Sequence, residues 1–117
     1  MEKREIGIAG ENAACAYLSK KGYLIENRNF RLNSGEIDII AMDKDEYVFI
    51  EVKTRISRKY GNPIEAINYY KKQHIVKAAT CYMYINFLKN KKIRFDVIEV
   101  YFYNKNSLIN HIKNVFN

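Results

Sequence analysis

Three ionisable residues stand at alternating positions in two neighbouring apolar segments. Asp38 lies in the run 35–41, and Glu51 and Lys53 lie in the run 49–55. Two carboxylates and an amine are groups that can hold a divalent cation, orient water and stabilise charge on a phosphate. If the fold brings these side chains together, the pattern indicates metal-assisted hydrolysis of a phosphate ester.

The segments 36–42 and 47–54 are typical of β-strands because apolar side chains recur at every second position. The short polar turn between them predicts an antiparallel hairpin. If that turn is a two-residue loop, Asp38 lies directly opposite Glu51, and the charged side chains of both strands share one face. The same register predicts a shared apolar face made of Ile37, Ile39, Ala41, Val48, Ile50 and Val52.

Carboxylates that face each other across a sheet repel, because their Cβ atoms lie only about 4.5–5.5 Å apart. A Mg²⁺ or Mn²⁺ ion that bridges Asp38 and Glu51 would offset the repulsion, and Lys53 would place a positive charge beside it. The alternative is a solvated salt-bridge cluster, in which each pair contributes about 0–1 kcal/mol. Apolar neighbours on the charged face indicate that it is partly covered, which favours a site.

Further elements must surround this hairpin. We expect a helix over 4–21, a strand over 23–31, a long helix over 62–88 and a strand over 93–102. The segment 107–116 is compatible with an edge strand and with a short helix. A right-handed crossover through the long helix predicts that the strands on either side of it are parallel. The sequence therefore predicts an α/β fold, a mixed β-sheet with helices packed on it.

Length and charge bound the function. The 117 residues, 48% of them apolar, are expected to form one domain, 1–117. Twenty Lys and Arg against thirteen Asp and Glu give a net charge of +7, which indicates a polyanionic partner such as nucleic acid or an anionic membrane surface. Scattered basic residues make the membrane the weaker alternative.

The cellular setting follows from what the sequence lacks. No apolar run reaches the length of a membrane-spanning helix, and the charged N-terminal residues lack the apolar stretch of a signal peptide. Cys15 and Cys81 stand far apart and outside any zinc-binding pattern. We therefore expect a cytoplasmic protein with reduced cysteines.

Several blocks of the sequence resemble a known family. Gly-Glu-Ile-Asp at 35–38, followed by Phe-Ile-Glu-Val-Lys-Thr-Arg at 49–55, resembles the PD-(D/E)xK motif of restriction-endonuclease-like folds, although Ile37 stands where the motif has proline. The resemblance to the YraN-like family of small bacterial proteins, for which endonuclease activity is expected, spans nearly the whole chain. It is carried also by Gly10-Glu11, Ala14, Tyr60-Gly61-Asn62-Pro63, Lys71 and Arg94-Phe95-Asp96-Val97. It implies a restriction-endonuclease-like core of order αβββαβ, similar to Holliday-junction resolvases.

The resemblance also implies roles for single residues. Asp38 and Glu51 match the metal-binding acids, and Lys53 matches the motif lysine. The backbone carbonyl of Val52 would be a further metal ligand. Glu11 matches an acid that resolvase-like enzymes place on the first helix, facing the metal. An ordinary exposed helix glutamate is the alternative for Glu11.

Basic residues near the strand ends are candidates for contacts with nucleic-acid phosphates. The candidates are Arg31, Arg55, Arg58, Lys59 and Lys71. Lys71 matches a family position on the long helix, where it would contact phosphate or support the acids. No DNA-reading helix motif and no glycine-rich phosphate loop is present, so sequence-specific recognition is not expected.

We therefore expect a Mg²⁺-dependent, structure-selective endonuclease that acts on DNA, with branched or damaged DNA as the substrate class. A homodimer that presents two sites to a junction is compatible with this small size. The alternatives are a non-catalytic nucleic-acid-binding or adaptor module with the nuclease fold, and a nuclease for RNA.

Overall fold

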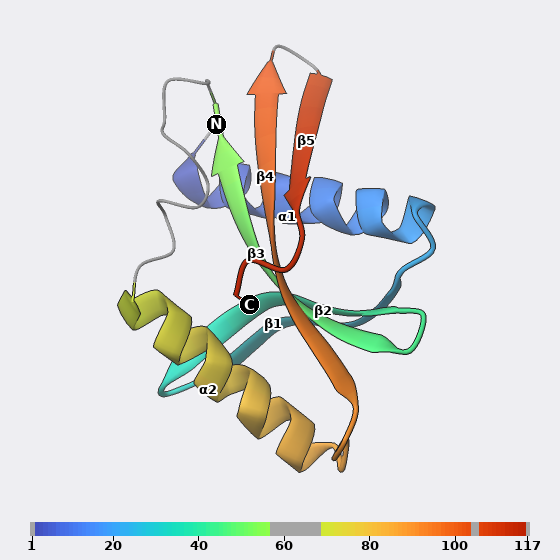
Figure 1. The fold of residues 1–117 in the computed structure, drawn as a ribbon. Coiled ribbons are helices and arrows are strands. Elements are labelled where there is room, and N and C mark those ends of the chain that lie inside the picture. Colours follow the sequence, from blue (N-terminus) through green and yellow to red (C-terminus); the bar gives the residue numbers. More distant parts are fainter. Residues whose placement is uncertain (1, 57–68, 104–105, 117) are drawn as a thin grey trace.

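The computed structural model describes residues 2–56, 69–103 and 106–116, which fold into a twisted sheet between two helices (Figure 1). The order is α1 (Lys3–Lys20), β1 (Leu24–Leu32), β2 (Gly35–Asp43), β3 (Glu46–Arg55), α2 (Tyr69–Ile85), β4 (Lys92–Tyr103) and β5 (Asn106–Ile112). None of the helices in these ranges is long and apolar enough to cross a membrane.

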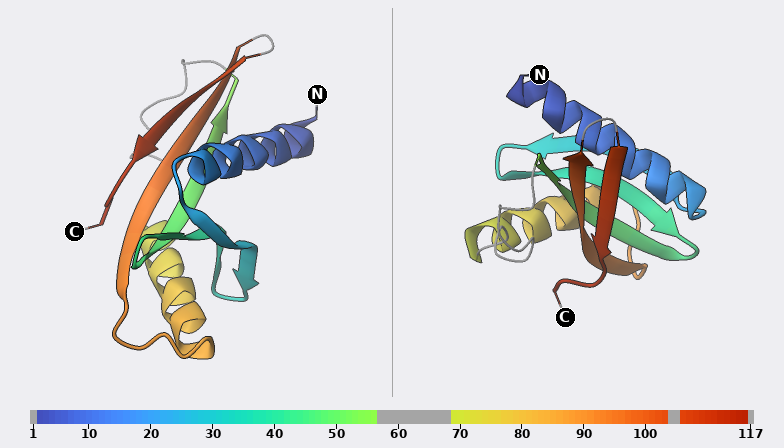
Figure 2. Two further views of the ribbon diagram at one scale, coloured as in Figure 1. Left: turned by 90° about the vertical axis from the view of Figure 1, so that its right-hand side faces the viewer. Right: turned by 90° about the horizontal axis from the view of Figure 1, so that it is seen from above.

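The strands lie in the order in which they occur in the chain, β1-β2-β3-β4-β5. β3 and β4 are parallel, and every other neighbouring pair is antiparallel. This confirms the α/β fold class and the parallel pair on either side of α2. α1 and α2 cover opposite faces of the sheet (Figure 2), so each face has its own apolar core.

α1 packs on its face through small side chains. Gly10, Ala14 and Leu18 are buried at intervals of four residues, which places them on one side of the helix. They meet a core made by the inward residues of the three central strands, which are Ile39, Ala41, Val48, Ile50, Ile98 and Val100. The helix ends before Gly22, whose φ of 93° is accessible to glycine at little cost.

α2 covers the opposite face. Its side chains Ile75, Ala78, Ala79 and Tyr82 are buried, and they pack on Ile37, Ile40, Phe49 and Phe95. The expected helix over 62–88 ends earlier, at Ile85, and its first residues lie outside the described ranges. The helical spacing of apolar residues over 62–88 also predicts Ile85 on the buried side of this helix, but Ile85, the last residue of α2, is exposed.

The expected faces of β2 need a correction. Ile37, Ile39 and Ala41 were expected on one face, but Ile37 packs in the α2 core and the other two pack in the α1 core. In the neighbouring strand, Asn29 has a φ of 55° between the pairs Arg28↔Ile39 and Phe30↔Ile37. Opposite this residue, between Ile37 and Ile39, β2 departs from the alternation of faces that a regular strand shows.

The C-terminal segment resolves the choice left open for 107–116. β5 pairs with β4 as an antiparallel edge strand, and residues 113–116, the described residues after Ile112, are not helical. A buried acid of β4, Asp96, fastens this segment: it accepts a hydrogen bond from the Asn114 N–H at 2.9 Å, and its Oδ2 lies 2.7 Å from His111 Nε2.

Candidate active site

The candidate site lies at the end of the β2–β3 ladder, where the two strands separate. The hairpin has the expected register from Asp43↔Glu46 to Ile39↔Ile50, and the ladder ends there. The expected direct pairing of Asp38 with Glu51 is therefore wrong. Beyond this point β3 continues beside β4, while the β1–β2 hairpin turns away (Figure 1).

Asp38 occupies the opening between the diverging strands. Its Oδ2 accepts a hydrogen bond from the backbone N–H of Val52 at 2.7 Å. A backbone N–H that loses its ladder partner needs another acceptor, and the carboxylate supplies it. The divergence thus fixes one oxygen of Asp38 on β3, one residue beyond Glu51.

Asp38 carries a strongly perturbed pKa. Burial, followed by the charge of Glu51, raises the pKa of this carboxyl from 3.8 to about 7. Glu11 and Glu36 add smaller contributions of the same sign, and the Val52 N–H opposes them. Carboxylates from α1, β2 and β3 therefore act on one another here even though no ladder pairs them directly.

Glu51 is buried, with 8% of its surface exposed, beside Phe49 and Ile75 on the side of the sheet that α2 covers. Its Oε1 lies 2.7 Å from Lys71 Nζ and 3.6 Å from Lys53 Nζ. Burial and the neighbouring Lys71 lower the pKa of Lys53, and Glu51 and Asp38 oppose that change. For Lys71, burial alone would lower the pKa, but the bond to Glu51 outweighs it and raises the pKa.

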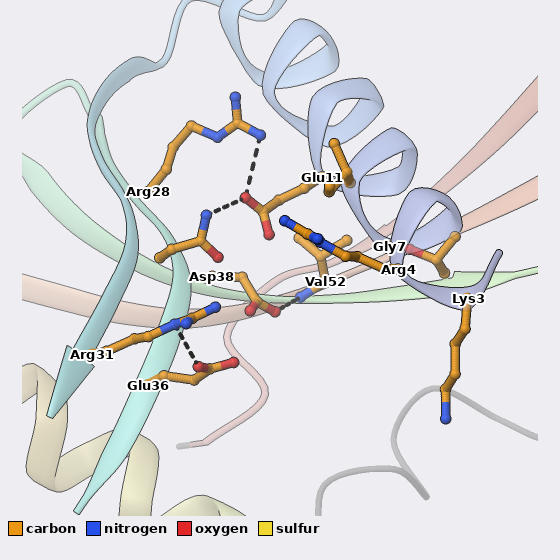
Figure 3. A pocket seen from close by; sticks show the side chains of 12 residues that line it. Lys3, Arg4, Gly7, Glu11, Arg28, Arg31, Glu36, Asp38 and Val52 are labelled. Atoms are coloured by element: carbon orange, nitrogen blue, oxygen red, sulfur yellow. Dashed lines mark hydrogen bonds and ion pairs between the residues drawn. The ribbon is translucent and has the colours of Figure 1, made fainter. Parts of the chain in front are cut away.

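Glu11 reaches the site from α1. Its Oε1 accepts hydrogen bonds from Arg28 Nη2 at 3.2 Å and from Asn29 Nδ2 at 2.8 Å, both on β1 (Figure 3). Arg28 also donates to Asn12 at 2.8 Å. Glu11 is therefore a held residue that faces Asp38, and not a solvated helix glutamate.

Asp38, Val52 and Glu11 line an open pocket of about 480 Å³, whose lining does not include Glu51, Lys53 or Lys71. It is bounded by Lys3, Arg4, Gly7, Ile8, Glu11, Arg28, Asn29, Arg31, Glu36, Asp38, Val52 and Thr54. The half-buried carboxylates of Glu11 and Asp38 form its floor, the exposed Arg31 and Glu36 lie on its rim, and Arg4 extends toward Glu11 (Figure 3). Such a distribution suits a phosphate group that approaches a cation held by the floor.

Of the other residues expected to contact phosphates, only some lie at this pocket in the described part of the chain. Arg31 lies on the rim and pairs with Glu36 at 3.1 Å. Arg55 instead pairs with the buried Glu99 of β4 at 3.4 Å, on the neighbouring strand. Arg58 and Lys59 lie outside the described residues.

The donors fit a hard cation of low protein coordination. In the described ranges, no group of three or more His, Cys, Asp or Glu side chains is arranged to hold a metal ion. Mg²⁺ commonly binds through one or two carboxylates and keeps its waters. Asp38 and Glu51 meet that requirement, because they are two mutually repelling carboxylates on diverging strands.

Several features of the site were absent from the sequence interpretation. Arg4 and Gly7 stand seven and four residues before Glu11, a spacing that places all three on one helix face, so this part of the rim could have been found. The contacts of Arg28 and Asn29 with Glu11 could not, because they depend on how β1 lies across α1.

The chain is similar to proteins of many bacteria. The profile of the family described as "Uncharacterised protein family UPF0102" matches residues 10–100. A UPF0102 protein of Caldanaerobacter subterraneus is 47% identical, with 99% of this chain and 98% of that protein covered. A UPF0102 protein of Caldicellulosiruptor saccharolyticus is 48% identical over 99% and 100% of the two chains, and one of Clostridium botulinum is 50% identical over 97% and 94%.

The chain belongs to the UPF0102 family. This confirms the YraN-like assignment made from the motif blocks. The matched region includes Glu11, Asp38, Glu51, Lys53 and Lys71, so all five fall within the part of the chain that defines the family.

Proposed function

We propose that this UPF0102 protein is a metal-dependent endonuclease that hydrolyses phosphodiester bonds in DNA. The observation that carries the proposal is the setting of Asp38, whose pKa is about 7 in a site shared with Glu51. Strongly perturbed carboxyl groups in a pocket are typical of functional sites. A neutral side chain at this position would avoid the repulsion, so the carboxylate is better explained by a cation that it binds.

Asp38, Glu51 and the carbonyl oxygen of Val52 would hold a Mg²⁺ or Mn²⁺ ion. Such an ion would lower the pKa of a water molecule and polarise a phosphoryl oxygen of the substrate. Glu11 would join this set by exchanging its contacts with Arg28 and Asn29. The hydrogen bond from Val52 to Asp38 keeps the floor in place before substrate arrives.

Lys53 is the group of this chain best suited to handle the proton. Its pKa is lowered by burial and by Lys71, so a larger share of its amines is neutral and able to accept a proton from water. In the protonated form it would donate hydrogen bonds to the phosphate and stabilise the charge that develops there. The leaving group would be the 3′ oxygen, which gives a 5′-phosphate product.

The charge of the surroundings supports a nucleic-acid substrate. The net charge of +7 and the basic rim over an acidic floor favour a polyanion whose backbone crosses the pocket. Contacts to phosphates fix position but do not identify bases. Selection by the shape of the DNA, as at branches or damaged positions, is therefore the specificity that we propose.

The two ion pairs of Glu51 favour a second candidate function. Lys71 lies 2.7 Å from Glu51 Oε1 and Lys53 lies 3.6 Å from the same oxygen, so two amines already neutralise this acid. A non-catalytic nucleic-acid-binding module would use the same basic surroundings and would need no metal.

The test is cleavage of labelled four-way junction, flap, duplex and single-stranded DNA, and of matching RNA, with Mg²⁺, Mn²⁺ or chelator. The variants are Asp38→Asn and Lys53→Met. The matched control is Glu36→Gln, which removes a half-exposed rim carboxylate paired with Arg31.

We expect metal-dependent cutting of branched DNA that the first two variants abolish and the control retains. Cutting that survives Asp38→Asn and Lys53→Met would overturn the assignment of the site. Metal-independent binding without any cutting would establish the non-catalytic module instead. Cutting confined to RNA would keep the chemistry and replace the substrate.

A further inference from the structure

The turn after α2 has an unusual residue at its sharpest point. The Phe87 N–H donates to the Tyr84 carbonyl at 3.2 Å, and the Leu88 N–H donates to the Met83 carbonyl at 2.9 Å. This pair of bonds forms the Schellman motif, in which the residue just beyond the helix adopts a left-handed conformation and is usually glycine. Here that residue is Phe87, with a φ of 56°, a conformation that is rare for a bulky side chain.

The folded chain gains little from this phenylalanine. Its side chain is 93% exposed, and the neighbouring Tyr84 and Ile85 are 83% and 55% exposed. Together they border a hollow of about 700 Å³. We call the "α2-end patch" the residues that line it, which are Met83, Tyr84, Ile85, Phe87, Leu88 and Lys89. Phe87 has a strained backbone, and its side chain does not pack in the core. This combination indicates that the side chain contacts another molecule.

The charge beside the patch selects its partner. Lys89, Lys91 and Lys92 follow Leu88 directly and are exposed. Of these three, Lys92 has a distant ion pair, 3.8 Å from the exposed Asp45. An apolar hollow with lysines along one border complements a chain that carries acidic and apolar side chains together.

Two other occupants fit less well. A second copy placed symmetrically would bring the lysines of both copies to the same interface, where like charges repel. The six lining residues also form a much smaller surface than the roughly 20–30 residues a side of a stable interface. Nucleic acid would stack on the aromatic rings of Tyr84 and Phe87, but Met83, Ile85 and Leu88 give the rest of the hollow aliphatic walls that a base would not use.

We propose that the α2-end patch is a docking site for a short acidic segment of a partner protein. An apolar side chain of that segment would enter the hollow beside Phe87, and its carboxylates would pair with Lys89 and Lys91. α2 rises about 1.5 Å per residue, so the patch lies about 20 Å along the helix from Lys71. Docking would therefore leave the pocket around Asp38 open and is independent of the proposed nuclease activity.

The test is selection of a displayed library of random short peptides on the full chain, followed by affinity measurements with the enriched peptides. The decisive variant is Phe87→Gly. Glycine is favoured at this position of the motif, so the variant should unfold at the same or a higher temperature than the wild type. Lys89→Glu tests the charge, and Asp45→Asn is a control that changes a neighbouring exposed charge.

We expect enrichment of peptides that combine Asp or Glu with a large apolar residue. Phe87→Gly and Lys89→Glu should weaken their binding at least tenfold, and Asp45→Asn should not. The proposal is overturned if no peptide is enriched, if the enriched peptides lack acidic residues, or if Phe87→Gly binds them equally. Tighter binding of single-stranded oligonucleotides, or self-association lost in Phe87→Gly, would also replace it.

Discussion

Asp38 holds the backbone of the neighbouring strand with its side chain, because its Oδ2 accepts the Val52 N–H at 2.7 Å. The bond forms one residue beyond the end of the β2–β3 ladder at Ile39↔Ile50. It satisfies a donor that the diverging strands leave without a ladder partner. The same bond also fixes the position of the Asp38 carboxylate, which belongs to the proposed site with Glu51.

The raised pKa of Asp38 predicts a cost to stability in the metal-free chain. The folded state binds this proton more tightly than the unfolded state, so the free energy of unfolding should fall as pH rises from 3.8 to about 7. Asp38→Asn keeps an oxygen for the Val52 N–H and removes the charge. At pH 8 in chelator it should raise the free energy of unfolding by about 2–4 kcal/mol, since one pKa unit corresponds to about 1.4 kcal/mol.

Urea unfolding at pH 8 and pH 5 checks this prediction. The increase in the free energy of unfolding that Asp38→Asn causes should be smaller at pH 5, where Asp38 is mostly protonated in the folded wild-type chain. Glu36→Gln is the control and should change little at either pH. A variant that is less stable than the wild type at pH 8 would show that the carboxylate is not repelled in the fold.

Two glycines of α1 predict opposite effects of one substitution. A Cβ at Gly10 would overlap Thr54 Oγ1 on β3, whereas a Cβ at Gly7 would meet nothing within 4 Å. Gly10→Ala should therefore lower the free energy of unfolding by about 1–3 kcal/mol. Gly7→Ala should raise it by about 0.5–1 kcal/mol through helix propensity. Urea unfolding of both variants measures the difference, and equal effects would contradict the close approach of α1 to β3.

Outside the site, the buried Asp96 should be the acidic residue whose substitution lowers the free energy of unfolding most. It is 1% exposed, and Arg94 donates two hydrogen bonds to it, each at 2.9 Å. Burial alone would raise the pKa of Asp96, but its bonds with His111, Arg94 and the Asn114 N–H outweigh burial and lower it. Asp96→Asn should cost about 3–5 kcal/mol at neutral pH.

The control for this change is Asp45→Asn. Asp45 forms an exposed ion pair with Lys92 at 3.8 Å, so its loss should cost less than about 1 kcal/mol. Chemical denaturation of both variants gives the comparison. A loss of similar size in both would show that Asp96 does not anchor the C-terminal segment.

Lys71 and a metal ion would compete for the same acid. Lys71 Nζ lies 2.7 Å from Glu51 Oε1, and hydrogen bonds to charged groups contribute about 1.5–3 kcal/mol. Lys71→Met should therefore tighten Mn²⁺ binding about tenfold, or 1.4 kcal/mol, and weaken metal-free binding of DNA. Isothermal titration calorimetry measures both. Lys77→Met, an exposed position on the same helix, is the control, and unchanged Mn²⁺ affinity in Lys71→Met would refute the competition.

Regular features of the fold were predictable from sequence. The hairpin register from Ile39 to Asp43 follows from the alternation of apolar side chains, because a shift by one residue would expose the core face. The parallel pairing of β3 with β4 follows from the crossover through α2. Both rules depend on repeating patterns that extend over many residues.

The details of the site were not predictable because they depend on breaks in those patterns. Residues 35–38 of β2 lie beyond the paired part of the β2–β3 ladder, and Ile37 packs on the opposite face from Ile39 and Ala41. The carboxylate of Asp38 consequently meets Val52 instead of lying directly across from Glu51. No periodicity records such a break, although the chemical types of the residues already indicated that they belong together.

Under the proposed function, Asp38 and Glu51 bind a divalent cation. Titration of the full chain with Mn²⁺, followed by electron paramagnetic resonance, tests it without interference from contaminating nucleases. We predict a saturable site that Asp38→Asn and Glu51→Gln remove and that Glu36→Gln retains. Absence of saturable binding in the wild type, or equal binding by Asp38→Asn, would contradict the account.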